Sequence, residues 1–359
     1  MKEIGKFRIA FSFAGCFLGA GYVSGQELWQ FFGSFGVLGF AGYFLALLIL
    51  GAFGCAIAYV AMSGGVIEMD KIVVHRDIRW LRAPVGALET IFLVCIPILM
   101  SAGTGAMVEQ VFGISPALGS AVFCVLVGAI AFLGSSGAVS VFSAFVPAML
   151  AAALIVSAFV LRGADITGKV FSANRDVNPL MGSWWFSAME YGAYNMFCSI
   201  GVLAPLAAQV KKRRTAYEGI GIGCLFLVVI GACVILAVIL AQGAKDKELP
   251  MLEIGFGISS VLGYIYSVLL LGGMFGTSAS SIFAVQVYVS EKSVFFRRRK
   301  WALIVPLCFI IWLCSLAGFG ELIGVVFPIC GFIGIWALIG IGITAFSQKR
   351  KEMKKVSAN

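Results

Sequence analysis

The sequence predicts an all-α polytopic membrane protein with about ten transmembrane helices, and three observations lead to this fold class. Apolar residues make up 61% of the 359 residues and charged residues only 12%, whereas about a quarter of the residues in a soluble domain are charged. The apolar residues form long runs, and a run of about 20 such residues spans a bilayer as a helix. The charged residues cluster between the runs, so we expect one integral membrane domain over residues 1–359.

The apolar runs place the expected helices in order along the chain, with polar residues, glycine or proline between them. The predicted spans are residues 4–35, 37–62, 83–108, 116–134, 138–161, 183–210, 217–242, 252–289, 301–319 and 321–346. The fourth and fifth spans are the least separated, because only Gly-Ser-Ser-Gly at residues 134–137 lies between them.

The distribution of Lys and Arg tests this arrangement independently, because short cytoplasmic loops carry an excess of basic residues. With the N-terminus inside, 21 of the 26 basic residues fall in inner segments. This predicts a multi-pass protein of the cell membrane with both termini in the cytoplasm. The net charge of +9 is then explained by basic loops facing an anionic lipid bilayer, and we expect no nucleic-acid partner.

The first span contains the most informative segment, residues 19–27, which reads GAGYVSGQE. Three glycines in seven residues, followed by Gln26 and Glu27, make a poor continuous helix. A break inside the membrane exposes backbone amides and carbonyls, which are tolerated only where they face protein, ions or a water-filled cavity. A half-helix beginning near Ser24 would also direct its positive dipole end toward an anionic group.

A purely structural interpretation of this segment stays open. The chain has 44 glycines, and the pairs Gly15/Gly19 and Gly21/Gly25 match the small-xxx-small spacing of packed membrane helices. Glu27 favours a functional interpretation, because it would lie about 12 Å inside the outer end of the helix. An acid at that depth costs about 2.5 kcal/mol or more to insert, and such acids are usually paired or functional.

The sixth span carries a similar segment at residues 188–195, AMEYGAYN. Glu190 would lie about 10 Å from the outer end of this span. If the chain is built as five plus five helices, this span opens the second half. Interrupted helices at matching places in two halves point to the binding site of a transporter. The alternative is that Glu190 meets water in an outer vestibule.

The eighth span presents a backbone carbonyl at Thr277 with hydroxyl groups at Ser280 and Ser281, which share one helix face because residues three and four apart are neighbours. Hard oxygen ligands of this kind suit a small cation. The alternative is that the hydroxyls bond to the preceding helical turn or to a neighbouring helix.

These features resemble the LeuT-type five-plus-five inverted repeat of the amino acid–polyamine–organocation superfamily. The segment at residues 19–27 is similar, more narrowly, to the YkvI-like amino-acid permeases of bacteria. The architectural resemblance covers nearly the whole chain. It implies a first repeat at about residues 4–161 and a second at about residues 183–346, with breaks in helices one and six.

The resemblance also implies a binding site, in which helix-one amides hold the carboxylate of a substrate and helix-six carbonyls hold its amine. The substrate-site candidates are Gly19, Gly21, Tyr22, Ser24, Gly25, Glu27, Glu190, Tyr191, Gly192 and Tyr194. The resemblance places a sodium ion between helices one and eight, with candidate ligands Thr277, Ser280 and Ser281. The sodium-coupled neurotransmitter-type members lack an acid pair like Glu27 and Glu190, so proton coupling, a directly bound cation and a cationic substrate stay open.

Together these features predict a secondary active transporter of a small solute, which we expect to be an amino acid, coupled to Na⁺ or H⁺ by alternating access. No cofactor beyond the coupling ion is expected. The sequence contains no catalytic constellation and no G-x-x-x-x-G-K-[ST] motif, which argues against an enzyme and against an ATP-driven pump. A non-transporting solute sensor, a structural subunit of a membrane complex and a channel remain alternatives. The sequence does not indicate an oligomeric state.

Overall fold

A computed structural model gives the structure of the protein and describes residues 5–66, 68–74, 79–133, 138–163, 177–241 and 243–357. These residues form helices joined by short connections, and no strand occurs among them. Five of the described helices are long and apolar enough to cross a membrane. The predicted all-α, multi-pass membrane fold is therefore confirmed.

The first half of the chain begins with a helix in three pieces, α1 (Lys6–Phe17), α2 (Ala20–Ser24) and α3 (Gln26–Phe31), followed by the short η1 (Gly33–Phe35). The elements that follow are α4 (Val37–Gly64), α5 (Met69–Val73), α6 (Arg79–Phe112), α7 (Pro116–Leu133) and α8 (Ala138–Gly163). The expected boundary between the fourth and fifth spans, residues 134–137, lies outside the described residues.

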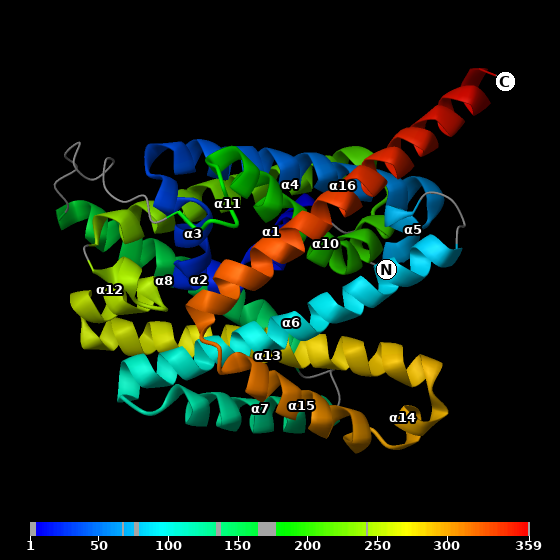
Figure 1. Cartoon of the computed structure of the whole chain (residues 1–359). Helices are drawn as coiled ribbons and strands as arrows, with labels where there is room; N and C mark the ends of the chain where they lie inside the picture. Colours follow the sequence, from blue (N-terminus) through cyan, green and yellow to red (C-terminus); the bar gives the residue numbers. More distant parts are fainter. Residues whose placement is uncertain are drawn as a thin grey trace.

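The second half begins with α10 (Trp184–Ala208) and α11 (Arg213–Leu240). The elements that follow are η2 (Ala244–Asp246), α12 (Pro250–Ile258), α13 (Ser260–Lys292), α14 (Val294–Arg298), α15 (Trp301–Ser315) and α16 (Phe319–Ser357). The described spans lie roughly alongside one another, with α16 crossing the bundle obliquely (Figure 1).

The predicted eighth span was wrong in one respect, because residues 252–289 form two helices and not one. The backbone of Ser259 is extended, with φ −165° and ψ 136°, and it separates α12 from α13. The two helices then pack against each other. Hydropathy does not detect this break, since both pieces are apolar.

The last helix extends well beyond the predicted end at residue 346. Its extra turns contain Gln, Lys, Arg, Glu and Met, which are good helix formers without being apolar. The C-terminal part of α16 projects beyond the rest of the bundle (Figure 1).

Helix α10 lies in the interior and packs between α4 and α16, while α1 packs against α11 and α13 against α6 and α8. Of the 25 residues of α10, 15 are buried. A helix facing lipid on one side buries a smaller share, so α10 is surrounded by protein over most of its length. It therefore positions its polar residues inside the bundle.

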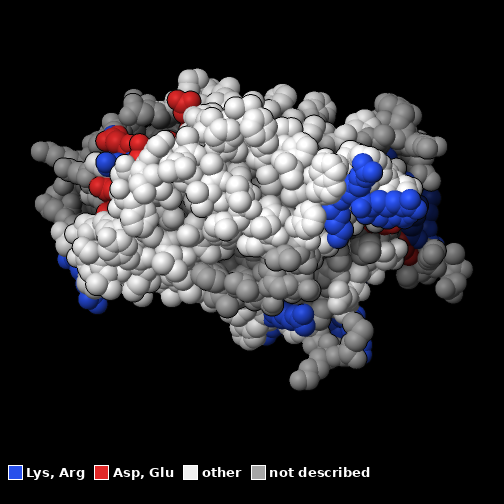
Figure 2. Space-filling model, turned by 90° about the horizontal axis from the view of Figure 1, so that it is seen from below, with Lys and Arg blue, Asp and Glu red and all other residues white. Residues whose placement is uncertain are grey.

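Charged residues gather at opposite ends of the molecule on the face seen in Figure 2, where Lys and Arg lie mainly toward one end and Asp and Glu mainly toward the other. The basic end is the one from which α16 projects in Figure 1. The surface between the two ends is almost free of charge on this face, as expected for a band that contacts lipid tails.

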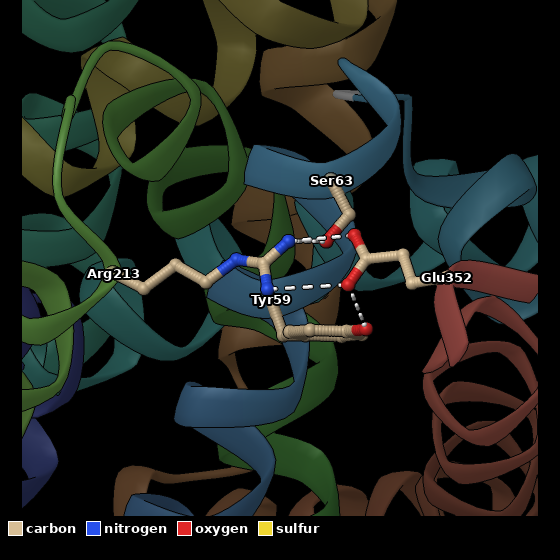
Figure 3. A network of polar contacts seen from close by, with 4 residues as sticks. All are labelled: Tyr59, Ser63, Arg213 and Glu352. Carbon is tan, nitrogen blue, oxygen red and sulfur yellow. Dashed lines mark hydrogen bonds and ion pairs between the residues drawn. The ribbon is translucent and has the colours of Figure 1, made fainter. Parts of the chain in front are cut away.

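At the basic end, Arg213 and Glu352 form a two-pronged ion pair that joins the start of α11 to the last turns of α16 (Figure 3). The Arg213 nitrogens donate to Glu352 at 2.6 and 3.2 Å. The hydroxyl of Tyr59 on α4 donates to the same carboxylate at 2.8 Å, and Arg213 also donates to Ser63 at 2.9 Å. A surface ion pair contributes only about 0–1 kcal/mol, so the network mainly fixes where the end of α16 lies.

Candidate functional site

The first helix is interrupted twice within the segment that the sequence singled out. The helix α1 ends at Phe17, and Gly19 is extended, with φ −78° and ψ 175°, before α2 begins. The second interruption is at Gly25, whose φ of 84° places it in the left-handed region. The predicted break in helix one is therefore present, and it frees backbone groups inside the bundle.

Gly25 is a glycine for two physical reasons. L-residues that carry a side chain rarely adopt a positive φ like that of Gly25. In addition, a Cβ atom at this position would lie 2.9 Å from Cγ2 of Val238 on α11 and 3.0 Å from Cγ of Met251 on α12. The turn between α2 and α3 is thus held tightly between two neighbouring helices.

Glu27 lies one residue beyond the start of α3, and only 4% of its surface is exposed. The hydroxyl of Tyr194 on α10 donates a hydrogen bond to its Oε1 atom. Its Oε2 atom lies over Gly21, where a Cβ would be only 2.5 Å away. The carboxyl group is therefore enclosed between the interrupted helix and α10.

Aromatic rings surround this carboxyl group. Tyr194 stacks on Phe327 of α16 with ring centroids 4.6 Å apart, and Tyr191 packs edge-on against Phe31, Phe32 and Tyr194. Tyr191 is fully buried. The structure thus brings the predicted residues Gly21, Glu27, Tyr191 and Tyr194 together in one region.

A second group of tyrosines, of which the sequence predicted only Tyr22, anchors α2. The hydroxyls of Tyr22 and Tyr43 lie 2.6 Å apart, and both donate to the carbonyl of Leu227 on α11. Tyr266 on α13 donates to the carbonyl of Val23 at 2.6 Å. No sequence signal pointed to Tyr43 or Tyr266, because neither lies in a segment of acids and glycines like those at residues 19–27 and 188–195.

Ser24 stays within its own segment, where its hydroxyl donates to the carbonyl of Gly21 at 3.0 Å and accepts from the amide of Gln26 at 3.4 Å. These bonds tie together the two ends of the turn. The side chain satisfies local backbone groups, which is a common use of serine beside a helix break.

The predicted break in helix six was wrong, because α10 is a continuous α-helix from Trp184 to Ala208. Gly192 serves close packing here: a Cβ on it would lie 2.7 Å from Cγ2 of Ile49 on α4. The side-chain amide of Asn195 donates to the backbone carbonyl of Tyr191, one turn earlier in the same helix. Glycine and asparagine in this segment therefore support a tight helix contact and not an interruption.

Glu190 is also buried, with 2% of its surface exposed, and it lies where α16 crosses α10. A Cβ on Gly331 of α16 would lie 2.6 to 2.8 Å from its Cβ, carbonyl oxygen and Cα atoms. Its Oε2 atom has no hydrogen-bond partner among the described residues. The two predicted acids thus have different surroundings: Glu27 has a tyrosine donor, and Glu190 lies beside a glycine contact.

The three predicted residues of α13 line one cavity, and the hydroxyl of Thr277 also bonds within its own helix. Thr277 donates back to the carbonyl of Gly273 at 2.9 Å, as in the structural alternative. Thr277, Ser280 and Ser281 all line a cavity of about 390 Å³, together with Glu89 of α6. The other residues that line this cavity come from α5, α6, α10 and α13.

A further cavity, of about 580 Å³, opens beside α3, the last piece of the interrupted helix. Its polar lining includes Gln26, Gln30, Asn178, Lys245 and Glu321. Gln30 donates to the carbonyl of Gly320 at 2.8 Å. No sequence pattern assigned these residues to a site, because they come from separate loops and helix ends.

Comparison with known sequences gives two relatives in Bacillus subtilis (strain 168), while no protein-family model matches the chain. The chain is 22% identical to the uncharacterized membrane protein YkvI over 352 residues, which cover 96% of this chain and 97% of YkvI. It is 20% identical to the uncharacterized protein YyaD over 326 residues, which cover 90% and 92% of the two chains.

Solved structures that share the fold include three transporters. The complex of MhsT with L-phenylalanine aligns with a TM-score of 0.60 and 15% identity, covering 96% of this chain and 89% of MhsT. The nucleobase-cation-symport-1 family transporter MHP1, closed around bromovinylhydantoin, aligns with a TM-score of 0.55 and 14% identity, covering 92% and 71%. A manganese transporter of Eremococcus coleocola aligns with a TM-score of 0.51 and 12% identity, covering 96% and 94%. The chain is therefore a LeuT-fold membrane protein with YkvI-like relatives in sequence, as the resemblance predicted.

Proposed function

We propose that the protein is a secondary active transporter that binds a small solute beside the interruption of its first helix. The observation that carries this proposal is the enclosure of Glu27 between α2, α3 and α10 within the bundle. A helix broken inside a membrane, with a buried acid beside the break, costs free energy. Such a combination is typical of a functional site. The LeuT-type fold gives this position further weight, because its solved examples named above are transporters.

The buried carboxyl group of Glu27 limits which ions or substrate groups can bind beside it. Burying an ionised carboxylate without a cationic partner is strongly unfavourable, and no basic side chain forms an ion pair with Glu27 among the described residues. The carboxyl group is therefore expected either to carry a proton or to face a cation. A coupling proton, a coupling Na⁺ ion and the ammonium group of a substrate all meet this requirement.

We propose an amino acid as the solute class. An amino acid supplies an ammonium group for Glu27 and a carboxylate for the first-turn backbone amides of α2 or α3, the helices that begin after the interruptions at Gly19 and Gly25. The MhsT structure is described with L-phenylalanine, and the aromatic rings around Tyr194 would accept an apolar side chain. For a Na⁺-coupled mechanism, Ser280, Ser281 and the carbonyl of Thr277 remain the proposed ion ligands.

Uptake into proteoliposomes tests the transporter proposal. Purified protein would be reconstituted and given labelled amino acids under an inward Na⁺ gradient, an inward H⁺ gradient or neither. Accumulation above the external concentration that requires one gradient would support coupled transport and name the ion. Binding without accumulation under any gradient would favour the solute sensor, and a flux that never exceeds equilibration would favour a channel.

Thermal unfolding in detergent provides the search for the solute before uptake is measured. A ligand at 100 times its dissociation constant stabilises the native state by about 2.7 kcal/mol. The panel would contain amino acids and simple amines, each in Na⁺ and in K⁺. The same panel run on Glu27→Gln and Glu190→Gln would assign the response to one acid, both or neither.

A further inference from the structure

A long groove on the outside of the bundle has no role in the proposed transport site. It has a volume of about 1130 Å³ and lies between α4, α10 and α16. Its walls are apolar along most of their length, with Ile49 and Phe53 on α4 and Ile339 and Ile343 on α16. Ser347 and Arg350 of α16 line one end.

The length of the apolar part matches one leaflet of a bilayer. On α16 it runs from Ile335 to Phe346, which is about 17 Å at 1.5 Å per residue. Half of the hydrocarbon core of a bilayer is about 15 Å. A groove that begins at the bilayer midplane therefore places its next residues, Ser347 and Arg350, at the level of the lipid headgroups.

The floor of the groove is open at Gly342. A Cβ on this residue would meet only Cε1 of Phe53, at 4.0 Å. This distance is ordinary van der Waals contact, so the missing side chain leaves space that no other protein group fills. A branched side chain at this position would take the place of a ligand without displacing the backbone of a neighbouring helix.

The groove ends at a basic residue, Arg350, on a part of α16 that is held in place by other residues. Arg350 is exposed, and no ion pair joins it to an acid in the part of the chain that the structure describes. Glu352, two residues later, is bound by Arg213 and Tyr59 (Figure 3). Residues two apart on a helix point in different directions. The network at Glu352 therefore holds α16 in place, while Arg350 points away from that network.

We propose that this groove binds one anionic phospholipid, with an acyl chain along Ile339, Gly342 and Ile343 and the headgroup phosphate at Arg350. The apolar length, the open floor at Gly342 and the unpaired cation at the headgroup level each match one part of such a lipid. The basic end of the molecule would face an anionic leaflet, to which basic residues are attracted.

Native mass spectrometry of the full-length protein in detergent tests this proposal. The protein would be mixed with phosphatidylglycerol or with phosphatidylcholine carrying the same acyl chains. We expect phosphatidylglycerol to be retained about fivefold more than phosphatidylcholine, which corresponds to the roughly 1 kcal/mol that one basic residue contributes near a membrane surface. Arg350→Gln should abolish this preference, whereas Lys349→Gln, with the same change of charge one residue away, should keep it.

Gly342→Leu separates the acyl-chain site from the headgroup site. This variant should retain neither lipid, while its thermal unfolding stays close to that of the wild type. Equal retention of both lipids by the wild type, or equal losses in Arg350→Gln and Lys349→Gln, would overturn the proposal. A dimer mass that disappears in Gly342→Leu would also overturn it, because the groove would then be covered by a second copy of the chain.

Discussion

The hydroxyl of Tyr194 donates a hydrogen bond to Oε1 of Glu27 and so connects the continuous helix α10 to the interrupted first helix. The two residues are 167 positions apart in the sequence. Both are enclosed by aromatic side chains, and Oε2 of Glu27 lies over Gly21. One carboxyl group thus links the break in the first helix to α10.

Replacing Glu27 by Gln should abolish coupled transport while leaving the fold intact. The amide oxygen of Gln can still accept the hydrogen bond from Tyr194, but the amide neither carries a proton nor balances a cation. We expect uphill accumulation in proteoliposomes to fall to the level of liposomes without protein. Glu109→Gln, at an exposed position of α6, is the matched control. Wild-type accumulation by Glu27→Gln would remove this residue from the site.

Gly21→Ala should impair transport more than it impairs stability. The new Cβ would lie 2.5 Å from Oε2 of Glu27, so the carboxyl group must move, and a flexible side chain moves at little cost. On α1, Gly15→Ala meets nothing within 4 Å and should be neutral or stabilising by about 0.5–1 kcal/mol. Thermal unfolding and uptake measured on both variants check this contrast. Equal uptake by the two variants would contradict it.

Gly331→Ala should have the opposite profile and destabilise the protein. Its Cβ would lie 2.6 to 2.8 Å from three Glu190 atoms, two of them in the backbone of α10, and a helix backbone cannot give way cheaply. Overpacking of this kind costs about 1–3 kcal/mol. Gly201→Ala, on α10 with nothing within 4 Å, is the control. Unfolding in detergent should begin at a lower temperature for Gly331→Ala alone.

Glu248, in the loop before α12, should make stability depend on pH. Burial raises the pKa of its carboxyl group above the usual value, although the amide of Phe319 opposes this by donating to it. The folded state therefore binds the proton more tightly than the unfolded state, so this stabilisation is full below the unfolded pKa of about 4.3 and is lost as pH rises through the folded pKa.

We therefore expect the apparent melting temperature to fall as pH rises across this range, and Glu248→Gln to flatten the decrease. Asp246→Asn, a change in η2 that keeps Glu248, should retain the wild-type slope. An unchanged slope in Glu248→Gln would show that another group causes the pH dependence.

Local composition was sufficient for much of the fold. Long apolar runs and the placement of Lys and Arg predicted a multi-pass helical membrane protein, because insertion depends on the residues of each run and its flanks. The glycines at 19, 21 and 25 predicted the interruption of the first helix for the same reason. The break at Ser259 was not predicted, because a change of direction between two apolar helices does not alter the hydropathy.

The site depended on contacts that a single sequence does not contain. By itself the sequence determined that Glu27 is an acid beside a helix break inside a membrane. Only the tertiary structure decided that Tyr194 reaches it, that Tyr22 and Tyr43 share the carbonyl of Leu227, and that Gly192 packs α10 on α4 and does not break it. The physical reason is that a glycine lowers the cost of breaking a helix and of approaching one closely, and the neighbouring helices determine which of the two occurs.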